Sequence, residues 1–231
     1  MPSYADGLKP DAAREKTTPA WLNRPARPEI VATPPLRPSN ALDAADALPR
    51  EGATENIPAR RAARGKLLHA LLQHLPAVAP ARRAEAAHKF LGARGAGFTS
   101  DETAAMAREA LGVIDNARLA ALFGAGSRAE AAIAGRVRLV DGREVEISGQ
   151  IDRLAETAEA ILLADFKSGA PRAAAETPER ILTQFALYRA ALQPLWPEKP
   201  IRTMLIWTAG PALVELNGDL LDRALARLAA P

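Results

Sequence analysis

The residues best suited to chemistry in this sequence are Asp165 and Lys167, which flank Phe166 at the end of the apolar run AILLA (160–164). Positions two apart on a β-strand share a face, so the carboxylate and the ammonium would project together. Charged groups that leave a buried strand are costly unless they pair or bind a ligand. Taken alone, the two residues are explained by a strand-end ion pair, and chemistry requires a second acidic group beside them.

Asp152 is that second group, because it ends the preceding predicted strand, which contains GQID. We expect this strand to pair with the one that carries Asp165, which would bring the two carboxylates close together. Like charges in such proximity repel unless a hard divalent cation lies between them. Mg²⁺ prefers one or two carboxylates, waters and phosphate oxygens. Beside them, Lys167 would hold an attacking water or stabilise charge that develops on phosphorus.

The elements that would position these residues follow from the periodicity of the sequence. Alanine-rich segments with a leucine stripe predict helices first, and alternating segments predict strands further along. The predicted helices cover 59–75, 80–94, 100–115, 116–123, 178–193 and 219–229, and the predicted strands cover 130–140, 144–155, 160–167, 201–208 and 212–217. This order indicates an α/β fold with a mixed central sheet flanked by helices and preceded by an N-terminal helical segment.

The N-terminal quarter differs in composition, since ten of the 19 prolines fall within the first 58 residues. Proline fixes φ and removes a hydrogen-bond donor, and neither helical nor strand periodicity persists there. We therefore predict that residues 1–56 form a Pro-rich linker or tether. Residues 57–231 form the predicted functional domain, with a helical part at 57–127 and an α/β core at 128–231.

The composition excludes several classes of function. A chain of 231 residues with 48% hydrophobic and 25% charged side chains is that of an ordinary globular protein. Because cysteine is absent, disulfides, thiolate zinc sites and an iron–sulfur cluster are excluded. No P-loop or strand-linked G-x-G-x-x-G motif predicts a nucleotide cofactor. No apolar run reaches the about 18–20 residues of a membrane span, and the sequence does not start with a signal peptide, so we expect a cytoplasmic protein without membrane contact.

The spacing of Asp152, Asp165 and Lys167, D-x12-D-x-K, resembles the signature of the PD-(D/E)xK nuclease superfamily. The longer segment GQIDRLAETAEAILLADFKSG, followed by TQFALYRAAL, is similar to the RecB-like branch, whose next helix carries Q-x-x-x-Y, here Gln184 and Tyr188. Within that branch, the chain most resembles the C-terminal nuclease domains of the AddA subunits of AddAB helicase–nucleases, of the alphaproteobacterial type. The similarity extends from about residue 21 to the C-terminus.

The resemblance implies a restriction-endonuclease-like fold and a role for each motif residue. The branch has a histidine on an upstream helix, which matches RGKLLHALLQHLP and therefore His69. The implied metal ligands are His69, Asp152, Asp165 and the Phe166 backbone carbonyl, the implied catalytic residues are Asp152, Asp165, Lys167 and Gln184, and Tyr188 would support the site or bind DNA. Glu130 fits an acidic position that is sometimes present in the branch.

The implied activity is that of a Mg²⁺-dependent deoxyribonuclease, with Mn²⁺ as an alternative ion, which hydrolyses phosphodiester bonds. The implied partners are DNA, chiefly single-stranded ends, together with a helicase and an AddB-type subunit for double-strand break repair and recombination. AddA-type proteins carry an ATP-driven helicase ahead of this domain, and this sequence has no helicase motif. The chain is thus expected to be free-standing, a split subunit or a fragment.

The charge pattern agrees with a polyanionic partner. Although the net charge is only +3, the segment from Asn56 to Ser100 holds eight lysines and arginines against one acidic residue. Such a local excess attracts polyanions. The candidates for binding the DNA backbone are the four basic residues that directly precede His69 on the same predicted helix, namely Arg60, Arg61, Arg64 and Lys66. For any one of these residues, a position on an ordinary solvent-exposed helix face is an equally good explanation.

Two other hypotheses compete with a nuclease. The chain could be a catalytically silent DNA-binding or assembly module of a helicase–nuclease complex, or an unrelated α/β domain in which the carboxylates simply pair with arginines. The joint presence of Asp152, Asp165, Lys167 and Gln184 favours the enzyme, because a silent site has no reason to keep them together.

Overall fold

A computed structural model of the chain describes residues 34–41, 56–169 and 171–229. All of them belong to one compact unit, Pro34–Pro231. Most of the predicted tether, residues 1–33 and 42–55, lies outside the described residues. Among the described helices, none combines the length and the apolar character that a membrane crossing requires.

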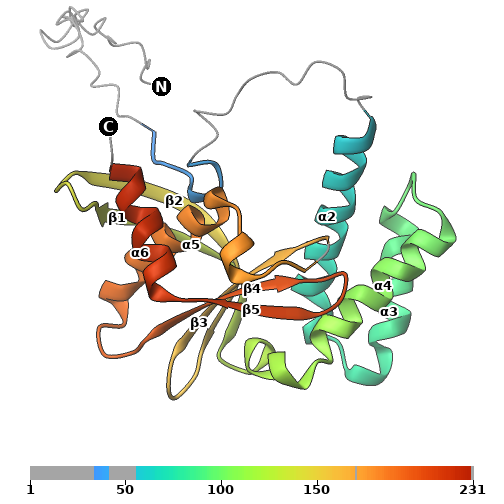
Figure 1. The fold of residues 1–231 in the computed structure, drawn as a ribbon. Coiled ribbons are helices and arrows are strands. Elements are labelled where there is room, and N and C mark those ends of the chain that lie inside the picture. Colours follow the sequence, from blue (N-terminus) through green and yellow to red (C-terminus); the bar gives the residue numbers. More distant parts are fainter. Residues whose placement is uncertain (1–33, 42–55, 170, 230–231) are drawn as a thin grey trace, which may run out of the picture. The chain divides into compact units, whose positions relative to one another are not determined.

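The described chain begins with helices and continues with a sheet, in the order that the periodicity predicts (Figure 1). The helices are α2 (Asn56–His74), α3 (Arg83–Arg94), α4 (Ser100–Ile114), α5 (Glu179–Leu192) and α6 (Gly218–Ala229), and the strands are β1 (Ser127–Arg138), β2 (Glu144–Glu156), β3 (Ile161–Lys167), β4 (Ile201–Trp207) and β5 (Ala212–Leu216). Short 3₁₀ turns lie between them: η1 (Pro38–Asn40), η2 (Leu75–Ala77), η3 (Pro80–Arg82), η4 (Ala117–Phe123), η5 (Ala174–Glu176) and η6 (Gln193–Leu195). The α-helix predicted for 116–123 is therefore the 3₁₀ segment η4 instead.

The five strands form one mixed sheet in the order β1-β2-β3-β4-β5. The pair β3–β4 is parallel, with α5 in the connection between the two strands, and the other pairs are antiparallel. Strand β3 is buried from Ile161 to Phe166, as a central strand covered on both faces must be. This mixed sheet flanked by helices confirms the predicted α/β fold class and agrees with the restriction-endonuclease-like fold.

Two apolar clusters cover the two faces of the sheet. Helices α2, α3 and α4 pack against Leu162, Ala164 and Phe166, and helices α5 and α6 pack against Leu163 and Leu205 on the opposite face. Figure 1 shows these two groups of helices on either side of the sheet. The alternation along β3 follows from the two-residue period of a strand, and it directs Asp165 toward α5.

A short N-terminal segment, residues 34–41, completes the free edge of β2. Strand β3 pairs only with residues 153–156 of β2, so the earlier part of β2 has an open edge. There the Leu36 amide donates to the Glu146 carbonyl at 2.7 Å, and the Ser148 amide donates to the Leu36 carbonyl at 3.0 Å. Residues 34–41 thus belong to the compact unit, although we expected the tether to extend to residue 56; the remainder of that boundary stays a prediction.

Candidate metal centre

Asp152 lies where β2 departs from regular alternation. Ile151 is buried in the cluster under α5, whereas Arg153 donates a hydrogen bond to the Leu72 carbonyl of α2 on the opposite face. Residues two apart on a regular strand share a face, so the alternation is broken at Asp152. The pairing of β2 with β3 also stops at Arg153. The break leaves the Asp152 carboxylate between the two faces, within reach of both β3 and α2.

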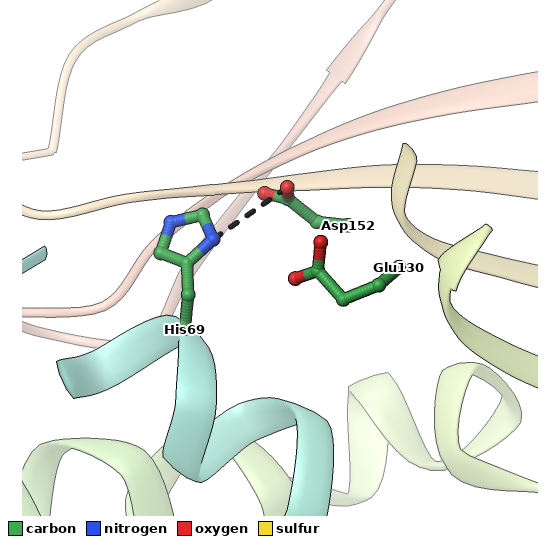
Figure 2. Close-up of side chains that lie close together, drawn as sticks. All are labelled: His69, Glu130 and Asp152. Atoms are coloured by element: carbon green, nitrogen blue, oxygen red, sulfur yellow. Dashed lines mark ion pairs between the residues drawn. The ribbon is translucent and has the colours of Figure 1, made fainter. Parts of the chain in front are cut away.

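His69 and Asp152 form an ion pair (Figure 2), and the backbone of Phe166 contacts both residues. The Asp152 Oδ2 atom accepts a hydrogen bond from the Phe166 amide at 2.8 Å, and Oδ1 lies 3.5 Å from His69 Nδ1. The other ring nitrogen, His69 Nε2, lies 3.2 Å from the Phe166 carbonyl oxygen. Both nitrogens of His69 therefore face acceptors, an arrangement that a positively charged ring satisfies in full.

The two pKa values in this pair move in the directions that favour charge. Burial lowers the pKa of His69, but the hydrogen bond to Asp152 and the negative charges of Asp152 and Asp165 outweigh it, so the pKa is raised. Burial raises the pKa of Asp152, but the hydrogen bonds from His69 and from the Phe166 amide, with the positive charge of His69, lower it overall. The site thus holds a carboxylate and stabilises a cation beside it.

Glu130 joins these residues from β1. The potential ligand atoms of His69, Glu130 and Asp152 all lie within 4.8 Å of one another, and Figure 2 shows the three side chains converging from separate elements. In the ladder with β2, Ala129 pairs with Arg153 and Ala131 with Ile151, which places Glu130 level with Asp152. Its φ of 48° lies in the left-handed region that residues other than glycine rarely adopt. Burial and the charge of Asp152 raise the pKa of Glu130.

Asp165 lies next to this group but is held by different partners. Its side chain is only 5% exposed; Oδ1 accepts a hydrogen bond from Gln184 Nε2 at 3.0 Å, and Lys167 Nζ lies 2.6 Å from Oδ2. Oδ2 is therefore buried and faces the Lys167 ammonium. Burial and the negative charge of Asp152 raise the pKa of Asp165 to about 6.

The second residue of the Q-x-x-x-Y motif, Tyr188, supports β2 from below. Its hydroxyl donates to the Gln150 carbonyl at 2.9 Å and accepts from the Gln150 amide at 3.2 Å, in place of a neighbouring strand. A Cβ atom at Gly149 would lie 2.6 Å from the Tyr188 hydroxyl, so this approach requires glycine. The side chain is 3% exposed, and burial raises its pKa to about 12. Supporting the site was one of the two roles expected of Tyr188; contact with DNA stays a prediction.

The four basic residues of α2 divide into two pairs. Arg60 forms an ion pair with Glu102 at 2.7 Å and stacks 4.8 Å over the Phe98 ring, and Arg64 forms an ion pair with Glu109. These two arginines attach α2 to α4. Arg61 and Lys66 are exposed and form no ion pair within the described part of the chain. DNA binding by all four stays a prediction. Arg61 and Lys66 are better placed for it, because their charges are not paired with a described carboxylate.

Two residues that hold the site together escaped the sequence analysis. Arg153 is 5% exposed, stacks 5.0 Å over the Phe123 ring and donates to the Leu72 carbonyl of α2; burial lowers its pKa. Residue 76, which would normally donate to that carbonyl within the helix, is proline and has no N–H. The adjacency of Arg153 to Asp152 was the only signal in the sequence.

Glu109 is the other such residue. On α4 it accepts hydrogen bonds from Arg64 of α2 and from the Thr208 hydroxyl after β4. The Thr208 amide in turn donates to the Lys167 carbonyl at 3.0 Å. The contacts therefore run from α2 through α4 to the end of β3, which carries Lys167. No periodicity or motif in the sequence marks Glu109, because its partners are remote along the chain.

The donor set suits a hard divalent cation. Two carboxylates that converge within 4.8 Å, with the Phe166 carbonyl beside them, are oxygen ligands of the kind that hard cations prefer. The imidazole of His69 is a ligand that several divalent transition metals also accept. Within the described residues, the converging group includes Glu130 and does not include Asp165. The structure thus brings together the expected ligands His69 and Asp152, and the Phe166 carbonyl oxygen lies beside His69. Asp165 lies outside this group and forms an ion pair with Lys167.

Comparison with known proteins identifies the family of the chain. A model of the PD-(D/E)XK nuclease superfamily matches residues 42–227, and the chain belongs to this superfamily. A crystal structure of SSO0001 is similar over 73% of this chain and 82% of its own, at 16% sequence identity and a TM-score of 0.32. No curated protein matches the sequence.

Proposed function

We propose that this chain is a divalent-cation-dependent deoxyribonuclease that hydrolyses phosphodiester bonds, with Mg²⁺ as its ion and Mn²⁺ as a substitute. The observation that supports this most is the convergence of His69, Glu130 and Asp152 within 4.8 Å, directly beside the pair formed by Asp165 and Lys167. Membership of a nuclease superfamily gives the reaction class.

The residues that would hold the cation are His69, Asp152, Asp165 and the Phe166 carbonyl, as the family resemblance implies, with Glu130 added by the geometry. A divalent cation at such a site lowers the pKa of a coordinated water and neutralises charge on the scissile phosphate. The raised pKa of Asp165, caused first by burial and then by the charge of Asp152, supports this assignment, because a cation between two such carboxylates relieves their repulsion.

Lys167 and Gln184 would orient the Asp165 carboxylate, and Lys167 would also offset its negative charge. In the protein described here Lys167 lies 2.6 Å from the Asp165 carboxylate, and its ammonium stands where it could stabilise negative charge that develops on phosphorus. Gln184 fixes the other Asp165 oxygen from α5, so the carboxylate keeps one orientation. These are positioning and charge-stabilising roles, and they need no large movement of the chain.

The biological setting is carried by the family resemblance alone. We propose single-stranded DNA ends as the substrate, delivered by an ATP-driven helicase that belongs to another chain or to another part of the same protein. An AddB-type subunit, double-strand break repair and recombination, and a cytoplasmic location belong to the same proposal. The similarity of GQID, DFK and Q-x-x-x-Y to AddA-type nuclease domains supports it.

The test is a cleavage assay on the full chain with end-labelled linear single-stranded and double-stranded DNA, in Mg²⁺ and in EDTA. We expect Mg²⁺-dependent cleavage that is lost, by about 10³-fold or more, in Asp152→Asn and in Lys167→Ala. Lys199→Ala is the matched control, since Lys199 also pairs with a carboxylate, that of Glu156, but at the other end of the sheet. Cleavage that persists in EDTA or in both site variants would refute the proposal. DNA binding without cutting in every condition would favour the silent module.

A further inference from the structure

A groove runs along α2 and ends at the candidate metal centre. The cavity has a volume of about 380 Å³ and is lined by Ala62, Gly65, Lys66 and Gln73 of α2, and it reaches His69 and Glu130 at the metal centre. Ala62, Lys66, His69 and Gln73 follow one another at spacings of three or four, and Gly65 lies three after Ala62 and four before His69, so these residues share one face of the helix. The other face of α2 is buried through Leu68, Leu71 and Leu72. The groove thus lies along a helix face that no other described element covers, and it leads to the ligands.

Gly65 is the residue of this face that internal packing does not explain. Glycine within a helix is less stable than alanine, because its backbone has more freedom to lose. A Cβ atom at Gly65 would meet nothing within 4 Å, whereas one at Gly149 would clash with Tyr188 at 2.6 Å. No contact within the described residues therefore requires a missing side chain at Gly65. Glycine also permits close approach of a ligand to the backbone.

The basic residues on and beside the groove could bind an anionic chain, and the acidic Glu130 lies only at its metal-centre end. Lys66 lines the groove, and Arg61 lies one helical turn before Gly65; both are exposed and form no ion pair with another described residue. Lysine binds phosphate as a mobile point charge. At the far end the groove meets the His69–Glu130–Asp152 group. A groove of this volume has room for about one nucleotide of a strand, because a pocket of this size normally encloses a single small molecule.

We propose that this groove is the track for one strand of the DNA substrate, with its sugar–phosphate backbone passing over Gly65 and against Lys66 toward the metal centre. The inference rests on the proposed nuclease function, and it adds the path of the substrate and the reason for Gly65. It predicts that a side chain at position 65 obstructs DNA without harming the fold. If a protein segment bound in the groove instead, substitutions at position 65 would not change the affinity for DNA.

The main test compares Gly65→Ala and Gly65→Leu with Gly92→Ala and Gly92→Leu. Gly92 is a matched control, because it lies in helix α3, its Cβ would also meet nothing within 4 Å, and it is outside the groove. Binding of a fluorescent single-stranded oligonucleotide is measured by anisotropy in EDTA, so that no cleavage interferes. We expect Gly65→Leu to weaken binding about ten-fold, the effect of roughly 1.4 kcal/mol, and Gly65→Ala to weaken it less. The Gly92 variants should bind as the wild type does.

Thermal unfolding separates obstruction from misfolding. Both alanine variants should unfold about 2–4 °C above the wild type, because alanine favours the helix. Gly65→Ala therefore should bind DNA less well while being more stable, which a purely structural role would not produce. Should Gly65→Leu fail to fold, the alanine variant still tests the track.

Lys66→Ala supplies an independent measurement, with Lys89→Ala on α3 as its control. Loss of one phosphate contact should reduce the slope of log affinity against log salt by about 1. Unchanged DNA affinity in Gly65→Leu and Lys66→Ala would overturn the track, and so would equal weakening in the Gly92 variants. If the wild type binds DNA through Gly65 but never cleaves it in Mg²⁺, the track holds and the proposed function falls. If cleavage occurs and Gly65→Leu cleaves normally, only the track falls.

Discussion

The two halves of the candidate site differ in how they are held. The α5 half, which consists of Asp165, Gln184 and Tyr188, is buried and fixed by hydrogen bonds to Asp165 and to β2. The α2 half, which consists of His69, Lys66 and the facing Glu130, is partly or fully exposed and borders the groove. The difference suggests a division of work: one half fixes the carboxylates in advance, and the other admits the substrate.

Their attachments differ as well. Helix α5 contacts β2 and β3 through buried polar groups next to the acids themselves. Helix α2 rests on a leucine face and is tied to the sheet by Arg153 at Leu72 and, through Glu109 and Thr208, by Arg64. Substitutions in the α5 half should therefore act on stability as well as on activity, and those in the α2 half chiefly on activity.

Gly149→Val should have the largest effect on stability. The new side chain would meet the Tyr188 hydroxyl, which a Cβ alone would approach to 2.6 Å, and would separate Tyr188 from Gln150. Overpacking and the loss of these hydrogen bonds together should cost about 3 kcal/mol in the free energy of unfolding. Urea unfolding measures the loss.

Gly135→Val in β1 is the control for that substitution, because a Cβ there meets nothing within 4 Å. The combination of Gly149→Ala with Tyr188→Phe should recover part of the loss that Gly149→Ala alone causes, since the hydroxyl is the nearest atom. Equal losses at Gly149 and Gly135 would show that the α5 half does not depend on this contact.

Asp165→Asn should stabilise the metal-free protein at pH 7, by about 2 kcal/mol. The pKa of Asp165 is raised from 3.8 to about 6, first by burial and then by Asp152. Between those values the folded protein binds more protons than the unfolded chain, so stability falls as pH rises through this window. The asparagine keeps an acceptor for Gln184 and removes the charge.

The advantage of Asp165→Asn should therefore be complete above about pH 6 and vanish below about pH 4. Thermal unfolding in EDTA across this range measures it, with the exposed Glu198→Gln as control. A variant less stable than the wild type at pH 7 would show that the Lys167 ion pair outweighs the cost of burial.

Arg153→Met should change stability little and activity more. Replacing a buried charge by an apolar side chain of similar length is often close to neutral, so we expect a change within about 1 kcal/mol. The Leu72 carbonyl loses its donor, and with it α2 loses a tie to β2 one helical turn from His69. DNA cleavage should then fall about ten-fold, as expected when a ligand shell is loosened.

The exposed Arg128→Met on the neighbouring strand β1 is the control for Arg153→Met. If Arg153→Met lost much stability and cleaved DNA as the wild type does, Arg153 would stabilise the fold and have no role in positioning His69.

The sequence predicts the parts of this site that depend on local geometry. The two-residue period of a strand places Asp165 and Lys167 on one face, and they form an ion pair. The antiparallel pairing of β2 with β3 brings Asp152 to the Phe166 amide. Most helices and all five strands follow from periodicity, and η4 differs because Asn116 and Gly124 bound a segment of only seven residues.

Other parts depend on contacts that no local pattern encodes. Glu130 reaches the site through a left-handed backbone conformation in β1, and a strand pattern does not predict it. Arg60 and Arg64 read as free charges in the sequence, but α4 supplies Glu102 and Glu109 as partners. Leu36 lies in a Pro-rich segment without periodicity and pairs with β2 only because β3 leaves that edge open.

The smallest effect concerns the charge on His69 in Asp152→Asn. In the wild type, the hydrogen bond and the negative charge of Asp152 overcome burial and raise the pKa of His69 above its ordinary value. Without that charge, burial is opposed mainly by Asp165, and the pKa of His69 should fall. NMR titration of the imidazole in metal-free buffer measures the shift, with His69→Gln to assign the signal and the exposed Asp101→Asn as control.

The same substitution has a consequence for stability, with a definite sign. A histidine whose folded-state pKa is raised stabilises the fold fully below its unfolded pKa of 6.5, and this contribution is lost as pH rises through the folded value. The difference between the wild type and Asp152→Asn that is due to His69 should therefore shrink above neutral pH. A His69 titration unmoved by Asp152→Asn would mean that the Phe166 carbonyl, rather than the carboxylate, holds the ring.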